Sequence, residues 1–138
     1  MKKEDKAVEY FRRKFNCSQA VFTVFGTEYG ISEDDCQKIG CGFGGGMGRQ
    51  QITCGAVTGA VMVLGLKFGK ASGDPEEKKT ETYIKVKEFF SEFSCIHGST
   101  VCRELLNGLD MNDSDDHKRI MDLRLFDTVC ERYMLPIQ

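Results

Sequence analysis

The chain has 138 residues, 41% hydrophobic and 29% charged, so it is long and apolar enough to fold as a globular domain rather than remain disordered. Its 19 Lys and Arg against 21 Asp and Glu give a net charge of −2, which leaves no electrostatic footprint for nucleic acid binding. Seven cysteines stand out, and in a chain without a secretory signal cysteines are more often catalytic or metal-binding than disulfide-bonded.

The N-terminal segment and the longest uncharged stretch decide the expected location. The first 14 residues are charged and contain no apolar stretch followed by a small-residue cleavage site, so no secretory signal is predicted. Residues 50–66 are uncharged but contain Gln and Thr, and the stretch is too short and too polar to span a bilayer. We therefore expect a cytoplasmic protein with no membrane span.

Three helices are predicted before the glycine-rich part of the chain. Apolar residues recur at helical spacing over residues 4–15. Asn16 followed by Gln19 predicts a capping box for a second helix, or a continuation of the first, over residues 17–29. A short third helix is expected to follow Ser32 and to end near residue 39.

The middle of the chain predicts a loop and then a buried helix. Six glycines lie within residues 40–48, which disfavours a helix there. Thr53 is the expected N-cap of a helix over residues 54–68, which is apolar on nearly every side and is predicted to be the buried centre of the fold. Gly55 and Gly59, with the alanines beside them, form a smooth surface for close helix contact. An all-apolar helix could also complete its burial across a two-fold interface in a homodimer.

Three further helices are predicted in the second half. The sequence Asp-Pro-Glu-Glu at residues 74–77 predicts a helix start, and that helix is expected to end near Gly98. A short helix over about 99–107 and a last helix starting at 113 or 114 follow. Since no alternating strand pattern is found, the fold class is all-α: five or six helices around a buried central helix at about 54–68, in a single domain over residues 1–138.

Cys54 is the sharpest candidate for a reactive residue. In the first turn of the predicted central helix, its thiolate would be stabilised by unpaired backbone N–H groups and by the positive end of the helix dipole. Gly55 would let another group approach the sulfur closely. The alternative interpretation is a buried, inert thiol.

The glycine-rich loop and Arg49 suggest an anion site beside Cys54. Glycines at 40, 42 and 45 match a formal GxGxxG pattern, but no strand precedes it, so nucleotide binding is not favoured. The Arg49 side chain and the N–H groups near Cys54 could still bind an anion. The loop, including Gly46, is expected to bring its backbone close to the sulfur of Cys54.

Five sequence blocks resemble the C_GCAxxG_C_C family of redox-active proteins over most of the chain, from about residue 7 to residue 130. The blocks are Asn16-Cys17, residues 44–49 (GGGMGR), residues 54–59 (CGAVTG), residues 102–106 (CRELL) and Cys130. The resemblance implies that Cys17, Cys54, Cys102 and Cys130 form a functional quartet. We expect Gly46, Arg49 and Gly55 to be the cofactor-binding residues beside it. It also implies that Cys36, Cys41 and Cys95 are additional to the quartet.

Several chemistries remain open for this quartet. Its members lie on different predicted helices, and helical bundles hold metals with side chains from facing helices. Four thiolates could bind an iron–sulfur cluster or another metal such as Zn²⁺, which makes a metal-binding electron-transfer module the first hypothesis. A thiol–disulfide oxidoreductase or redox sensor with Cys54 as the reactive thiol is the second, and a non-catalytic helical interaction protein is the third. His97 could be a ligand, a proton shuttle or a surface histidine. A redox partner protein or a small-molecule acceptor is implied.

Overall fold

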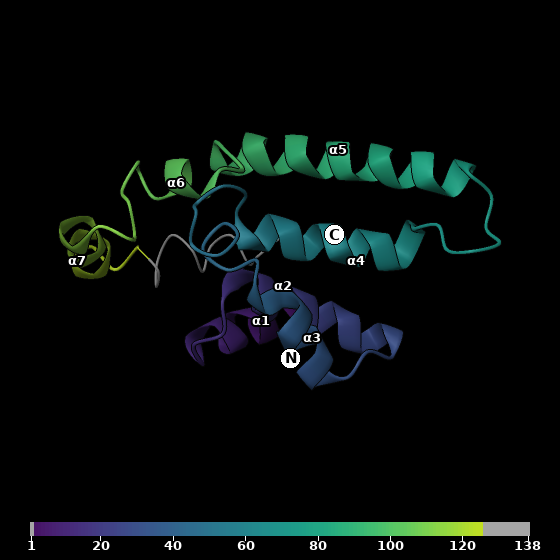
Figure 1. Cartoon of the computed structure of the whole chain (residues 1–138), viewed down its shortest axis with the longest axis horizontal. Coiled ribbons are helices and arrows are strands. Elements are labelled where there is room, and N and C mark those ends of the chain that lie inside the picture. Colours follow the sequence, from purple (N-terminus) through teal and green to yellow (C-terminus); the bar gives the residue numbers. More distant parts are fainter. Residues whose placement is uncertain (1, 126–138) are drawn as a thin grey trace.

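The computed structural model describes residues 2–125, and these form helices and loops without a strand (Figure 1). The elements are α1 (Lys3–Arg12), α2 (Cys17–Gly26), the 3₁₀ helix η1 (Thr27–Tyr29), α3 (Glu33–Cys41), α4 (Gly55–Phe68), α5 (Glu77–His97), α6 (Cys102–Leu105) and α7 (Ser114–Asp122). The all-α class is confirmed. The described part contains seven α-helices rather than five or six, because the backbone turns at Lys14 (φ 70°) and separates α1 from α2.

Helix α2 packs closely on α4 because two glycines of α4 face it. A Cβ atom on Gly55 would lie 2.9 Å from the Cβ of Cys17, and one on Gly59 would lie 3.0 Å from the Cβ of Val21. The start of α2 is fixed by the predicted capping box, in which the Asn16 side chain accepts from the Gln19 N–H group and the Gln19 side chain accepts from the Asn16 N–H group, both at 2.9 Å. The first turn of α2 is therefore held against the first turn of α4.

The two long helices α4 and α5 run antiparallel, with α1, α2 and α3 on the opposite side of α4 (Figure 1). The first two turns of α4 are buried, but Leu66 near its end is 37% exposed. The prediction of a central buried helix thus holds only for its N-terminal half; on the C-terminal half Val63 still packs against Phe22 of α2, whereas Leu66 lies at the surface. Tyr83 and Ile84 of α5 are also exposed, and the two-fold interface expected from the sequence stays a prediction.

Several helix boundaries differ from the sequence-based expectation. Helix α5 begins at Glu77 rather than just after Asp74, because the Asp74 carboxylate accepts a hydrogen bond from the Ala71 N–H group at 2.9 Å instead of capping the helix. Helix α6 has only four residues. Helix α7 begins as predicted, with Asp113 accepting from the Asp116 N–H group at 3.0 Å, and the apolar face expected beyond residue 125 lies outside the described residues.

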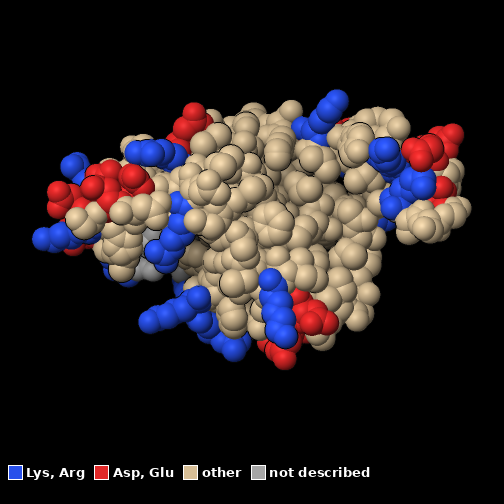
Figure 2. Space-filling view, viewed as in Figure 1, with Lys and Arg blue, Asp and Glu red and all other residues tan. Residues whose placement is uncertain are grey.

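Charge is spread without a dominant sign over the face shown in Figure 2. Basic and acidic side chains occur together along its edges, and most of its centre is uncharged. Within residues 2–125, no helix has both the length and the apolar character needed to cross a membrane.

Candidate functional site

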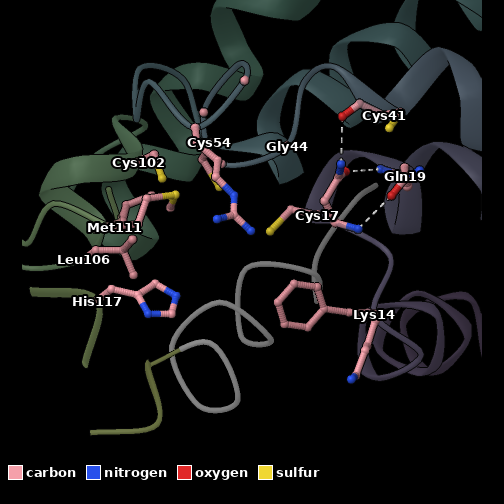
Figure 3. Close-up of a pocket in the computed structure, with 18 residues that line it drawn as sticks. Lys14, Cys17, Gln19, Cys41, Gly44, Cys54, Cys102, Leu106, Met111 and His117 are labelled. Atoms are coloured by element: carbon pink, nitrogen blue, oxygen red, sulfur yellow. Dashed lines mark hydrogen bonds between the residues drawn. The ribbon is translucent and has the colours of Figure 1, made fainter. Parts of the chain in front are cut away.

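A pocket of about 390 Å³ lies where the starts of α2, α4 and α6 meet the glycine-rich loop (Figure 3). Each of these three helices brings a cysteine of the predicted quartet to it: Cys17 is the first residue of α2, Cys54 is the N-cap of α4, and Cys102 is the first residue of α6. Cys130 lies outside the described residues. The structure therefore brings together three positions separated by up to 85 residues of sequence (102 − 17).

Cys54 and Cys102 are positioned by a short antiparallel backbone pairing between Thr53 and Val101. The Cys54 N–H group donates to the Thr100 carbonyl at 2.8 Å, and the Cys102 N–H group donates to the Ile52 carbonyl at 2.6 Å. Residues that follow the paired positions on both segments lie on the same face of the pairing. The two thiols are therefore diagonal neighbours, as Figure 3 shows.

Burial dominates the electrostatics of these two thiols. Burial raises the pKa of Cys54, whose residue is 5% exposed, and the N–H groups of Ala56 and Val57 oppose that rise. Burial, and then the nearby charge of Cys54, raise the pKa of Cys102 to about 12. The helix start acts on Cys54 in the direction expected from the sequence, but the cost of desolvating the thiolate is larger. In this fold the pKa of Cys54 is therefore raised, opposite to the direction expected from its place at the helix start.

The glycines around Cys17 leave space for the first turn of α2. A Cβ atom on Gly44 would come within 2.3 Å of the Asn16 amide nitrogen, which donates a hydrogen bond to the Cys41 carbonyl at 2.9 Å. A Cβ atom on Gly55 would also lie 2.9 Å from the Ser18 backbone nitrogen. Gly55 thus admits the close approach of α2 and also lines the pocket, and its expected role in opening access to the Cys54 sulfur stays a prediction.

Gln51, which was not predicted to be a functional residue, connects the glycine-rich loop to the segment that contains Leu109 and Met111. Its residue is 4% exposed; its side-chain nitrogen donates to the Leu109 carbonyl and its side-chain oxygen accepts from the Met111 N–H group, both at 2.8 Å. A Cβ atom on Gly46 would lie 2.6 Å from the Ile52 nitrogen. Gly46 therefore lines the pocket because the loop folds tightly onto the Gln51 backbone.

Residues 15–135 match the family described as "Putative redox-active protein (C_GCAxxG_C_C)". The chain belongs to this family. A protein of Archaeoglobus fulgidus named "Uncharacterized protein" is 25% identical to it over 129 residues, which cover 88% of this chain and 85% of that protein. No solved structure matches the chain.

The remaining cysteines of this C_GCAxxG_C_C chain divide into different environments. Cys41, the last residue of α3, is exposed and lines the pocket, although it is not one of the predicted quartet. Cys36 is fully buried and packs in a separate cluster with Phe22 and Val63, so it is packing material. Cys95 is exposed on α5 and does not line the pocket.

Three basic side chains also line the pocket. Arg49 was expected near Cys54 and does line it, together with Lys14 and His117, which the sequence analysis did not select. The His117 ring points into the space shared with Cys17 (Figure 3). His97 lies elsewhere, with its ring centroid 4.6 Å from that of Phe93. The histidine beside the thiols is therefore the one on α7.

The metal expected from the sequence would need several Cys, His, Asp or Glu side chains close together. Within residues 2–125, no group of three or more His, Cys, Asp or Glu side chains is arranged to hold a metal ion. The six described cysteines, Cys17, Cys36, Cys41, Cys54, Cys95 and Cys102, form no disulfide with one another. The described thiols alone therefore do not fit a thiolate-bound metal or an iron–sulfur cluster. Among them, Cys54 and Cys102 interact electrostatically, since the charge of Cys54 raises the pKa of Cys102.

Proposed function

We propose that this member of the C_GCAxxG_C_C family is a thiol–disulfide redox protein in which Cys54 and Cys102 alternate between two thiols and one disulfide. The observation that carries the proposal is their placement as diagonal neighbours on one wall of the pocket, close enough for a charge on Cys54 to raise the pKa of Cys102. The family description supports redox chemistry without naming a reaction.

The reaction is an exchange with an external disulfide. The Cys54 thiolate forms a bond to one sulfur of that disulfide, whose S–S bond breaks and releases one thiolate. The Cys102 thiolate then bonds to the Cys54 sulfur, and the second external thiol leaves. Two electrons pass from the protein to the external disulfide, and the two protons lost by the cysteines end on the two released thiols.

Cys54 is the better attacking thiol of the pair. Burial raises the pKa of both thiols, but the N–H groups of Ala56 and Val57 oppose the rise at Cys54, whereas the charge of Cys54 adds to the rise at Cys102. Diagonal neighbours in regular antiparallel pairing have Cα atoms roughly 7–8 Å apart, and disulfides rarely exceed about 6.8 Å. Closing the bond therefore requires the start of α6 to move toward Cys54, and α6 is a single turn of four residues.

Disulfide mapping in a thiol redox buffer tests this proposal. We expect oxidation to remove the thiols of Cys54 and Cys102 together and peptide mass spectrometry to find them linked. Cys54→Ser and Cys102→Ser should each abolish the two-electron transition, whereas Cys95→Ser, on the exposed face of α5, should retain it. A transition that survives in Cys102→Ser, or a linkage that never includes Cys54, would contradict the proposal.

A metal-bound quartet is the second candidate, because Cys17 lines the same pocket as Cys54 and Cys102. In that case Cys130 would supply the fourth thiolate for an iron–sulfur cluster or another metal in an electron-transfer module. The variant Cys17→Ser separates the two candidates, since it removes a ligand but leaves the proposed disulfide pair intact. Metal analysis and visible absorption after anaerobic purification should show bound iron or zinc in the parent and a loss in the variant only if the metal candidate is correct.

A further inference from the structure

We propose that the pocket selects small disulfides that carry carboxylate groups, a substrate class that rests on the proposed thiol–disulfide function. The described lining contains Lys14, Arg49 and His117 and no Asp or Glu. This is opposite in sign to the chain as a whole, which has a net charge of −2. A concave site lined by one sign of charge raises the local concentration of ligands of the other sign.

The two permanent cations of the pocket are available to a ligand. Ion pairs of the described residues join Lys3 to Glu28 and both Lys70 and Lys79 to Glu76, and neither Lys14 nor Arg49 takes part in these pairs. Arg49 is held at the loop end by its backbone, since its N–H group donates to Gly44 and its carbonyl accepts from Asn112 at 2.7 Å. The guanidinium is therefore attached to a fixed backbone beside the thiols, where it can pair with a carboxylate.

The burial of Cys54 favours a small molecule over a protein disulfide. The residue is 5% exposed and lies at the pocket wall, so a disulfide on a protein surface would not reach its sulfur without displacing the glycine-rich loop. A volume of about 390 Å³ lies within the range of small-molecule sites.

The test compares three small disulfides of similar length and different charge. Dithiodipropionate is a dianion, hydroxyethyl disulfide is neutral, and cystamine is a dication. The rate at which each oxidises the Cys54–Cys102 pair of the reduced full chain is divided by its rate with free dithiothreitol, which removes intrinsic reactivity. We expect the normalised rate for the dianion to exceed that for the dication by about tenfold at low salt and to fall as salt is added.

Variants assign the preference to the pocket. Arg49→Gln should remove most of the preference by raising the KM for dithiodipropionate much more than that for hydroxyethyl disulfide, and Arg49→Lys should restore the preference. Lys87→Gln removes an equal charge from an exposed position on α5 outside the pocket and should leave the preference intact. Equal or reversed normalised rates would overturn the substrate class while leaving the disulfide function standing. If no disulfide oxidises the pair, the proposed function and the substrate class both fail.

Discussion

The two ends of helix α4 are both mainly apolar but lie in opposite environments. At the pocket end, Ala56 and Val57 are at most 1% exposed, and Gly55 is closely covered by α2. The backbone of Cys54 is hydrogen-bonded to the segment before α6. At the other end, Leu66 is 37% exposed and Gly65 has no atom of another element within 4 Å of a built Cβ. Hydropathy alone assigns both ends to the core.

What separates the two ends is the contact made by their glycines. Gly55 is needed because the Cβ of Cys17 and the backbone nitrogen of Ser18 occupy the place of a side chain, whereas the site of Gly65 is open. A glycine in a helix costs roughly 1 kcal/mol relative to alanine. At the pocket end this cost is offset by the close approach of α2, which also brings Cys17 to the pocket.

The largest expected effect comes from filling the contact at Gly55. Gly55→Ala should lower the free energy of unfolding by roughly 3 kcal/mol, because the added methyl group would lie 2.9 Å from both the Cys17 Cβ and the Ser18 nitrogen. Urea denaturation of the reduced protein measures the change. The matched variant Gly65→Ala, in the same helix, should instead stabilise by roughly 0.5–1 kcal/mol. Similar effects at the two sites would show that the two ends are packed alike.

The next effect tests whether the pocket end is held from both sides. Gln51→Ala should lower the free energy of unfolding by roughly 2 kcal/mol, because it removes the hydrogen bonds that the Gln51 side chain makes to the Leu109 carbonyl and the Met111 N–H group. Thermal or urea unfolding measures it, and hydrogen exchange at Met111 should accelerate. Gln50→Ala is the control, since the Gln50 side chain is exposed and makes one hydrogen bond, at 3.3 Å, to the nearby Met47 carbonyl. A Gln51 variant as stable as the Gln50 variant would contradict this role.

The sequence predicts local features of this fold better than its long-range contacts. The Asn16 capping box and the start of α7 depend on residues three apart, and both are found. Gln51 could not be recognised, because its partners lie 58 and 60 residues away. His117 reaches the pocket only through the same loop arrangement.

The direction of the Cys54 pKa also depends on long-range structure. A helix start lowers the pKa of a thiol, which the sequence indicates, but the depth of burial is set by which elements close over the site. Here burial outweighs the helix start. Asp74 shows the same limit at a helix boundary, because its carboxylate accepts from Ala71 in the preceding loop instead of capping α5.

The smallest of the three effects concerns the stability of the pocket end at high pH. In the unfolded chain the Cys102 thiol ionises near 9.0, whereas in the fold its pKa is about 12. The unfolded state therefore loses this proton first, so the stabilisation is complete below about pH 9 and is lost as the pH rises toward 12. Between about pH 8 and about pH 10 this thiol should account for a loss of roughly 1.4 kcal/mol, and Cys54, whose pKa is also raised, acts in the same direction.

Urea denaturation of the reduced protein at the two pH values separates this loss from the titration of other groups. The decline in stability should be shallower in Cys102→Ser than in the parent, because serine does not ionise in this range. Cys95→Ser should decline as steeply as the parent, since it removes an exposed thiol and leaves both buried ones in place. Equal declines in the parent and in Cys102→Ser would mean that the Cys102 thiol ionises as readily in the fold as in the unfolded chain. Water would then reach the Cys102 thiol freely, and the thiols at the pocket end of α4 would not be buried as described.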